Sequence, residues 1–193
     1  LAYTRLALIY YNRNMDDRAL TYCKTVVDKY PRTESSQDAM RLAEMIYVNS
    51  GRGDEYLDWL KTVPNADIKI TRQDSLLYES AMTQFRAGDC DKAIKGFNSY
   101  IERFGSKGFF LINAHYYAAE CENSKKNTAE AIKHYVYAAS QSKNEHSENA
   151  TIKLARLFYA DKNFGEAQKY YEQLEKIATS EINYIEGLMG QMR

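Results

Sequence analysis

Apolar side chains recur every three or four residues along most of the chain, with polar side chains between them. This spacing follows the 3.6-residue period of an amphipathic helix and differs from the two-residue alternation of a strand. Short polar turns interrupt the pattern at regular intervals, so the helical segments come in consecutive pairs. The pattern therefore predicts an all-α chain built from helix–turn–helix pairs.

One small residue marks the second helix of each predicted pair and reveals an internal repeat. The marked positions are Ala19, Tyr56, Ala93, Ala131 and Ala167, at successive intervals of 37, 37, 38 and 36 residues. A matching series marks the first helices, at Ala7, Glu44, Ala81, Ala119 and Ala155. In the second pair, Glu44 and Tyr56 stand where the other pairs have alanine, so regular helix packing is not predicted there.

The alanines have a packing reason, because a small side chain lets two helix axes approach closely. A single helix pair buries too little apolar surface to offset the entropy of ordering its chain, so neighbouring pairs must stack on one another. The sequence thus predicts one solenoid domain over residues 1–193. Its repeats are expected at about 1–33, 34–70, 71–107, 108–144 and 145–179, followed by a terminal helix at 181–192.

Short polar side chains are expected to cap the second helices by accepting a backbone N–H. The expected caps are Asn14, Asp89, Asn127 and Asn163. Thr71-x-x-Asp74 and Ser142-x-x-Glu145 resemble capping boxes ahead of first helices. The segment Pro64–Gln73 breaks the pattern and is either a packed loop or an extended connector that hinges the array.

The repeated residues resemble the tetratricopeptide repeat (TPR). That family has small residues near positions eight and twenty of its repeat and an aromatic residue near twenty-four, as in Ala119, Ala131 and Tyr135 here. The resemblance implies a right-handed α-solenoid of about five helix–turn–helix repeats plus a terminal helix. It is strong in the third to fifth repeats and weak in the second.

The endings of the repeats carry a finer resemblance. Asp28–Pro31 and Glu102–Gly105 are similar to repeat endings in the TPR arrays of Gram-negative cell-envelope proteins, of the Tol–Pal-associated and outer-membrane assembly types. A periplasmic or outer-membrane-associated location is what this resemblance implies. Because Leu1 starts inside a helical pattern, we expect the chain to be a fragment of a larger many-repeat bacterial protein.

The first helices of a TPR array line its concave face, and the resemblance therefore implies a binding groove. The side chains expected to line it are Tyr11, Arg41, Met45, Tyr78, Met82, Phe85, Arg86, Tyr116, Arg156 and Tyr159. Such an aromatic and methionine-rich surface with arginines suits an apolar helix or an extended segment of a partner. The alternative is that these side chains only pack against the next repeat.

Candidate chemistry is sparse. No phosphate loop, metalloprotease or nucleophile-elbow motif occurs. His115 and His134 are expected in helices of the fourth repeat and His146 in a polar connector. The three cysteines are an odd number at wide spacing, so they are read as small buried residues and not as a disulfide framework. The sequence predicts no catalytic residue, no metal site and no cofactor.

Charge and hydropathy narrow the class of partner. Positive and negative side chains are equal in number in each half of the chain, so the basic surface of a nucleic-acid binder is missing. The longest apolar runs, such as Leu6–Tyr11, are too short for membrane insertion. We therefore expect a non-catalytic scaffold that binds another protein or peptide. The alternative is a structural spacer of a larger array, which self-associates through its terminal repeats.

Overall fold

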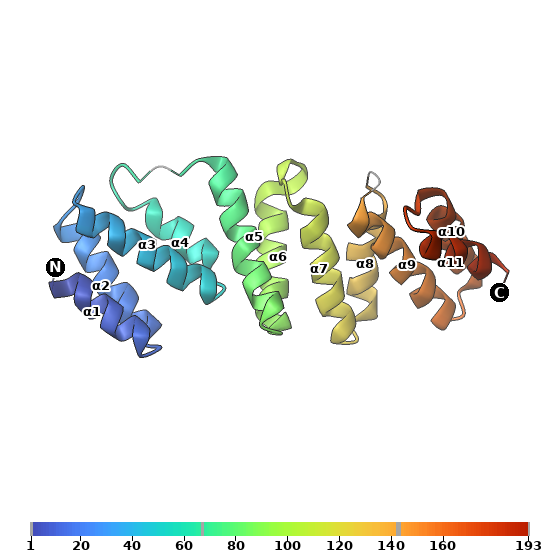
Figure 1. Cartoon of the computed structure of the whole chain (residues 1–193), viewed down its shortest axis with the longest axis horizontal. Helices are drawn as coiled ribbons and strands as arrows, with labels where there is room; N and C mark the ends of the chain where they lie inside the picture. The colour runs from blue at the N-terminus through green and yellow to red at the C-terminus, as the bar shows by residue number, and fades with distance from the viewer. Residues whose placement is uncertain (1, 67, 142–143, 193) are drawn as a thin grey trace. The chain divides into compact units, whose positions relative to one another are not determined.

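The computed structural model describes residues 2–66, 68–141 and 144–192. All regular elements in these ranges are helices, eleven α-helices and one short 3-10 turn (Figure 1). The chain divides into two compact units, Leu1–Tyr100 and Ile101–Arg193, which are described separately below. The predicted all-α fold of paired helices is confirmed.

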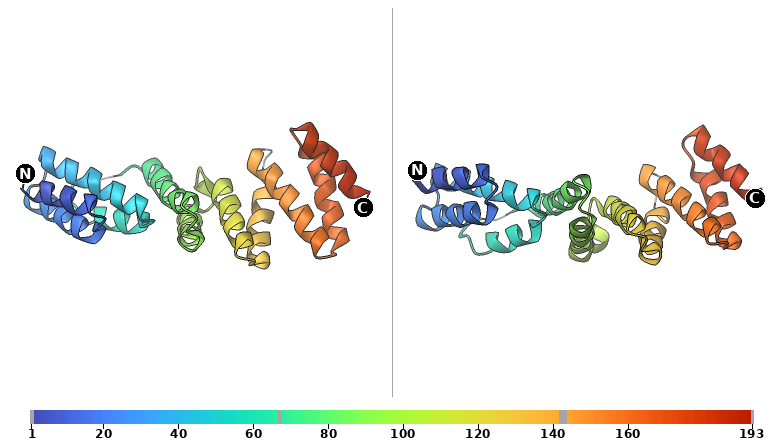
Figure 2. Two further views of the ribbon diagram at one scale, coloured as in Figure 1. Left: turned by 60° about the horizontal axis from the view of Figure 1, so that its bottom comes forward. Right: turned by 90° about the horizontal axis from the view of Figure 1, so that it is seen from below.

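The N-terminal unit is built from helices that pack in chain order. Its members are α1 (Ala2–Asn12), α2 (Asp16–Lys29), α3 (Glu34–Asn49), α4 (Gly53–Leu60), α5 (Ile70–Arg86) and most of α6 (Cys90–Phe104). Helix α3 packs on α1, α2, α4 and α5. A first helix thus contacts its own second helix and the pair that precedes it, and Figure 2 shows the α1–α2 pair side by side at the blue end.

The C-terminal unit continues this arrangement. It contains η1 (Gly105–Lys107), α7 (Leu111–Ser124), α8 (Thr128–Ala139), α9 (Glu145–Ala160), α10 (Phe164–Ile177) and α11 (Glu181–Gln191). Each α-helix of the series α7 to α11 packs on the next one along the chain. Helix α11 lies against α10, at the place where the sequence predicts a terminal helix.

The marker alanines lie where helices meet. Ala7, Ala19, Ala119 and Ala131 are fully buried. A methyl group at these positions lets two helices approach closely, and large rings from the second helices then fill the core. Tyr135 packs in this way within the core of the C-terminal unit, where Tyr171 belongs to the same cluster.

The predicted helix caps are correct in part. Asp89 and Asn163 accept backbone N–H groups, from Lys92 and Glu166. Asn127 is the N-cap residue of α8, but its amide donates to Glu122 and caps no backbone group. The prediction for Asn14 is wrong, because the residue lies in the turn with a φ of 55° and Met15 precedes α2 instead.

The capping boxes differ from the prediction as well. Helix α5 already begins at Ile70, so Thr71 lies inside it and caps nothing. Ser142 is outside the described residues, and the capping box of α9 is formed by Asn144 and Ser147. The earlier start of α5 also shortens the interruption predicted at Pro64–Gln73, because its last four residues are helical.

The cysteines correct another expectation. Cys90 and Cys121 are disulfide-bonded, whereas Cys23 is a free, buried thiol. Burial raises the pKa of Cys23 to about 12, so this thiol stays protonated and unreactive. Spacing along the sequence does not show which cysteines pair in the fold, so the expectation that the cysteines form no disulfide is wrong for Cys90 and Cys121.

Candidate functional site

In each unit the first helices of successive pairs border a hollow. In the N-terminal unit it lies between α3 and α5 and has a volume of about 260 Å³. Its lining residues are Arg41, Glu44, Met45, Val48, Asn49, Arg72 and Glu79. Arg41 and Met45 were predicted for the groove, so the structure places part of that prediction on an accessible surface.

Two of the lining residues, Glu44 and Arg72, belong to a polar triad completed by the buried Tyr56. The hydroxyl of Tyr56 on α4 donates to Glu44 Oε2 on α3 at 3.1 Å, and Arg72 on α5 forms an ion pair with the same carboxylate. Arg72 also lies 3.5 Å from Glu79. Burial and the adjacent Glu44 carboxylate raise the pKa of Tyr56, so it remains a hydrogen-bond donor at all physiological pH values.

The floor of the hollow is apolar and partly exposed. The Tyr11 hydroxyl lies 3.9 Å from Met45 Sδ, which brings α1 and α3 together at this surface. Met45 is 41% exposed although it is a large apolar residue. The Arg41 side chain is exposed and forms an ion pair with Asp38, one turn earlier in the same helix. The exposed apolar side chain of Met45 thus lies near the exposed guanidinium group of Arg41.

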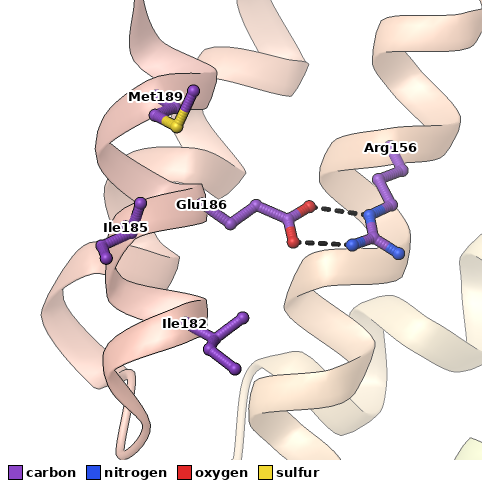
Figure 3. A pocket seen from close by; sticks show the side chains of 5 residues that line it. All are labelled: Arg156, Ile182, Ile185, Glu186 and Met189. Atoms are coloured by element: carbon purple, nitrogen blue, oxygen red, sulfur yellow. Dashed lines mark hydrogen bonds and ion pairs between the residues drawn. The ribbon is translucent and has the colours of Figure 1, made fainter.

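The C-terminal unit has a second hollow, between α9 and α11, with a volume of about 340 Å³. It is lined by Arg156, Ile182, Ile185, Glu186 and Met189 (Figure 3). Three of these side chains are apolar and substantially exposed, and Ile182 reaches 78%. This hollow is therefore more apolar than the one between α3 and α5.

A bidentate ion pair crosses the second hollow. Arg156 donates from Nε and from an Nη atom to the two oxygens of Glu186, at 2.7 and 2.6 Å (Figure 3). Hydrogen bonding to Glu186 raises the pKa of Arg156, which stays charged in any case. The guanidinium predicted to meet a partner is thus already paired within the chain.

Other predicted groove residues lie deeper. Tyr78 packs its ring 6.1 Å from the rings of Phe97 and of Tyr100, and Met82 is buried at 7% exposure. Phe85 is half-buried, whereas Arg86, the last residue of α5, is exposed. Tyr78 and Met82 thus occupy positions inside the N-terminal unit.

In the C-terminal unit, Tyr116 packs against Tyr117, Tyr135 and His146 and is half-buried. Tyr159 is partly exposed and meets Phe164 edge to face, at a centroid distance of 5.5 Å. Seven of the ten predicted residues belong to the N-terminal unit, and Tyr116, Arg156 and Tyr159 belong to the C-terminal unit. The structure brings together Tyr11, Arg41 and Met45, and it places Arg156 beside α11.

None of the histidines is among the lining residues of either hollow. Nδ1 of His115 on α7 lies 2.9 Å from Nδ1 of His134 on α8. His146 lies in the first turn of α9, which corrects its predicted place in a polar connector. Burial lowers the pKa of all three, that of His115 to about 4. They are neutral at pH 7.

Sequence reasoning missed several lining residues. Nothing in the repeat pattern singles out Arg72, because it precedes the marker alanine of its helix by nine residues. Ile182, Ile185 and Met189 lie within the predicted terminal helix, and extending the first-helix register to that segment would have found them. Glu44 was noticed only as an exception to the alanine rule.

Two further features of the described residues concern metal ions and membranes. Within residues 2–66, 68–141 and 144–192, no group of three or more His, Cys, Asp or Glu side chains is arranged to hold a metal ion. In the same ranges, no helix combines the length and apolarity that crossing a membrane requires.

Comparisons with known proteins agree with the repeat architecture. The family described as "Tetratricopeptide repeat-like domain" matches residues 61–181, and the family "Tetratricopeptide repeat" matches residues 1–33. No curated protein sequence matches the chain.

Among solved structures, YrrB is described as a TPR protein with an unusual peptide-binding site. It is 15% identical, with 99% of this chain and 91% of that chain covered and a TM-score of 0.50. PilF of Pseudomonas aeruginosa is 14% identical, with coverage of 97% and 96% and a TM-score of 0.47. At such identities the likeness to YrrB concerns the fold alone.

The family matches decide the assignment. The first covers well over half of the chain, and the second adds the first repeat. Proteins of this family are non-catalytic scaffolds for protein–protein interaction, in agreement with the expected absence of enzymatic activity. The chain belongs to the tetratricopeptide-repeat family.

Proposed function

We propose that this chain binds a segment of a partner protein at the first-helix faces, with the hollow between α3 and α5 as the principal contact. The observation that supports the proposal is the exposed apolar floor at Met45 beside the solvent-directed Arg41. An apolar side chain of the partner would be buried on Met45 and Val48. A partner carboxylate would replace Asp38 as the neighbour of Arg41.

The triad behind this floor supplies rigidity. Glu44 holds Tyr56 and Arg72 from two other helices, so α3, α4 and α5 are tied together at the rim. A preorganised surface loses less entropy when a partner binds. Tyr78, Met82, Phe85 and Tyr116 are then supports of the repeats, and Tyr11, Arg41 and Met45 are the proposed contacts.

Site-specific photo-crosslinking tests this proposal. A benzophenone amino acid at position 45 is expected to capture a partner in extract of the source cells, and the same group at the exposed Arg13 is not. Arg41→Glu with Met45→Ala is expected to abolish capture, whereas the matched charge reversal Arg13→Glu leaves it intact. Capture that persists in a folded Arg41→Glu/Met45→Ala chain would exclude the hollow as the contact.

A second candidate function is self-association or stacking on further repeats, and α11 favours it. Leu188 and Tyr184 lie 36 residues after Ile152 and Glu148 of α9. Ile152 and Glu148 are 7% and 3% exposed, whereas Leu188 and Tyr184 are 38% and 44% exposed. The face that other elements cover on α9 is thus bare on α11.

Sedimentation over a concentration series tests this alternative. Self-association through α11 predicts a weight-average mass that rises with concentration. Leu188→Glu is expected to restore the monomer, and Thr128→Glu, at an exposed site in the same unit, is the control. A strict monomer at high concentration would contradict self-association without affecting the proposed groove.

We also propose that the protein works in an oxidising compartment, such as the cell envelope suggested by the repeat endings. The disulfide-bonded state of Cys90 and Cys121 supports this location, because such bonds are rare in reducing cytosol. Denatured, unreduced protein from its source cells is expected to react with a maleimide once, at Cys23. Three labelled thiols would contradict the proposal.

The repeat boundaries expected from the sequence, at about 1–33, 34–70, 71–107, 108–144 and 145–179, remain predictions.

A further inference from the structure

All three histidines of the chain lie in the C-terminal unit, on helices that are consecutive in the sequence. His115 is on α7, His134 on α8 and His146 in the first turn of α9, and each is half-buried. The helices α1 to α4 contain none. Groups that titrate between neutral and mildly acidic pH are therefore confined to one region.

The geometry of the His115–His134 pair disfavours the uptake of further protons. Its Nδ1–Nδ1 distance of 2.9 Å is a hydrogen bond, in which one nitrogen donates and the other accepts. A first added proton binds the other ring nitrogen of the donor imidazole and leaves that bond in place, but it brings a charge into a partly buried site. A second proton removes the acceptor and sets two positive N–H groups against each other. His115 cannot easily turn away, because its ring stacks on Tyr137 with 3.8 Å between centroids.

The first repeat shows what the same positions do without titration. His115 lies four residues before Ala119 and His134 three residues after Ala131, as Tyr3 and Tyr22 do relative to Ala7 and Ala19. The rings of Tyr3 and Tyr22 stack with centroids 6.1 Å apart. An uncharged aromatic pair therefore fits between the two helices of a repeat at these positions. In the fourth repeat, two histidines that can take up protons stand in its place.

His146 adds a third proton acceptor in the same region. Its Nε2 lies 2.9 Å from Asn113 Nδ2, and its Nδ1 is buried without a hydrogen-bond partner. The rings of Tyr116 and Tyr117 lie 5.0 and 5.4 Å from the imidazole. A protonated His146 would carry its charge into this partly buried site, where Asn113 can accept a hydrogen bond from Nε2–H only after its amide turns over to present Oδ1.

The charged neighbours do not cancel these costs. Glu122 on α7 and Glu130 on α8 favour a charged His134, and Lys133 opposes it. Glu145 favours a charged His146. For His115 the charged neighbour is His134 itself. Burial outweighs the carboxylates at His134 and His146, and at His115 burial and His134 act in the same direction, so the pKa is lowered at all three.

We propose that α7, α8 and the first turn of α9 form an acid-sensitive element, which opens locally as its histidines take up protons while α1 to α4 stay closed. The element goes beyond the proposed binding function, because its residues lie outside both hollows. It would make the fourth repeat respond to the pH of the compartment.

The direction of the effect follows from linkage. The folded pKa of His115 is about 4 and its ordinary value is 6.5, so the open state binds protons first. Stability from this group is complete above pH 6.5 and is lost as the pH falls toward 4. At pH 5, His115 alone is expected to raise the opening equilibrium constant on the order of 30-fold.

Two measurements on the whole chain test the proposal. NMR titration of the imidazole Cε1–H signals is expected to give apparent pKa values below 6.5, with His115 and His134 titrating as a coupled pair. Hydrogen exchange, corrected for the intrinsic rate at each pH, is expected to show protection in α7 and α8 falling at least tenfold between pH 7.5 and pH 5. Protection in α1 and α2 is expected to stay constant.

A designed variant separates the histidines from other acid effects. His115→Tyr with His134→Tyr installs the tyrosine pair of the first repeat and is expected to abolish most of the pH dependence in α7 and α8. His146→Gln removes the third histidine separately. Unshifted imidazole titrations in the wild-type chain, or equal loss of protection in α1–α2 and α7–α8, would overturn the proposal whether or not the variants fold.

Discussion

The second and fourth repeats tie their helices together with the same kind of polar triad, built at different positions. In the fourth, the Tyr135 hydroxyl on α8 bonds Glu120 on α7, and Lys153 of α9 pairs with that carboxylate at 3.1 Å. In the second, Tyr56 of α4 bonds Glu44 of α3, and Arg72 of α5 completes the triad. A tyrosine of the second helix thus meets a glutamate of the first and a cation of the next pair.

The difference lies in what surrounds each triad. The fourth repeat keeps the close approach of Ala119 and Ala131, so its triad is an addition to a regular core. In the second repeat, Glu44 and Tyr56 occupy the alanine positions themselves, so the triad replaces the close contact. The second repeat accordingly has a shorter second helix, α4, of eight residues. A degenerate repeat can therefore stay packed when polar groups satisfy one another.

The largest expected effect is on the regular core. Tyr135→Ala empties the centre of the fourth repeat, where the side chain is fully buried, and is expected to cost about 3–5 kcal/mol of unfolding free energy. Urea denaturation measures it. Tyr135→Phe keeps the ring and loses only the bond to Glu120, at an expected cost of about 1 kcal/mol. Similar costs for the two variants would show that the triad, and not the ring, holds the fourth repeat.

The triad of the second repeat should dominate its stability. Glu44→Ala leaves the buried Tyr56 hydroxyl and Arg72 without their common acceptor and is expected to cost about 1–3 kcal/mol. Glu120→Ala is the matched change in the fourth repeat and is expected to cost less, because the alanine contacts remain. A double-mutant cycle of Glu44→Ala with Tyr56→Phe is expected to show coupling of about 0.5–3 kcal/mol. Additive costs would contradict the triad.

These two repeats also show how far the sequence leads. The period of the alanines predicted the helix pairs and the terminal helix, because helix packing needs small residues at fixed intervals. The period did not predict that Arg72 pairs with Glu44. The two residues are 28 positions apart, and which long side chains meet across that distance depends on how the helices pack. Tyr78 and Met82 were assigned to the groove by the resemblance to TPR arrays, and the structure shows Tyr78 against two rings of its own unit and Met82 buried. The disulfide-bonded state of Cys90 and Cys121 was not predicted either, because spacing along the sequence does not show which cysteines pair.

An acid-dependent effect of intermediate size is expected at α11. Glu148 on α9 accepts hydrogen bonds from the backbone and hydroxyl of Thr179 and from Asn183. Burial raises the pKa of Glu148, but these hydrogen bonds outweigh it and leave the pKa below its ordinary value of 4.5. The stability it contributes is therefore present above pH 4.5 and is lost as the pH falls through the lower folded pKa.

Glu148→Gln is expected to cost about 1–2 kcal/mol at pH 7 and progressively less below pH 4.5, as measured by urea denaturation at each pH. The window lies below the one in which the histidines titrate, so the two effects separate along the pH axis. A cost that does not change between pH 7 and pH 3 would show that the charge of Glu148 does not hold α11.

The smallest loss of stability is expected for the Arg156–Glu186 ion pair that crosses the second hollow. Its cost can be compared with that of the hydrogen bonds in the triads. Arg156 is 59% exposed, so solvent screens its attraction to Glu186, and Arg156→Ala is expected to cost at most about 1 kcal/mol. Added salt should reduce that cost, whereas the cost of Tyr56→Phe should be insensitive to salt because that hydrogen bond is partly buried. A salt-independent loss above 2 kcal/mol for Arg156→Ala would mean that the pair fastens α11 as firmly as Glu44 fastens α4 and α5.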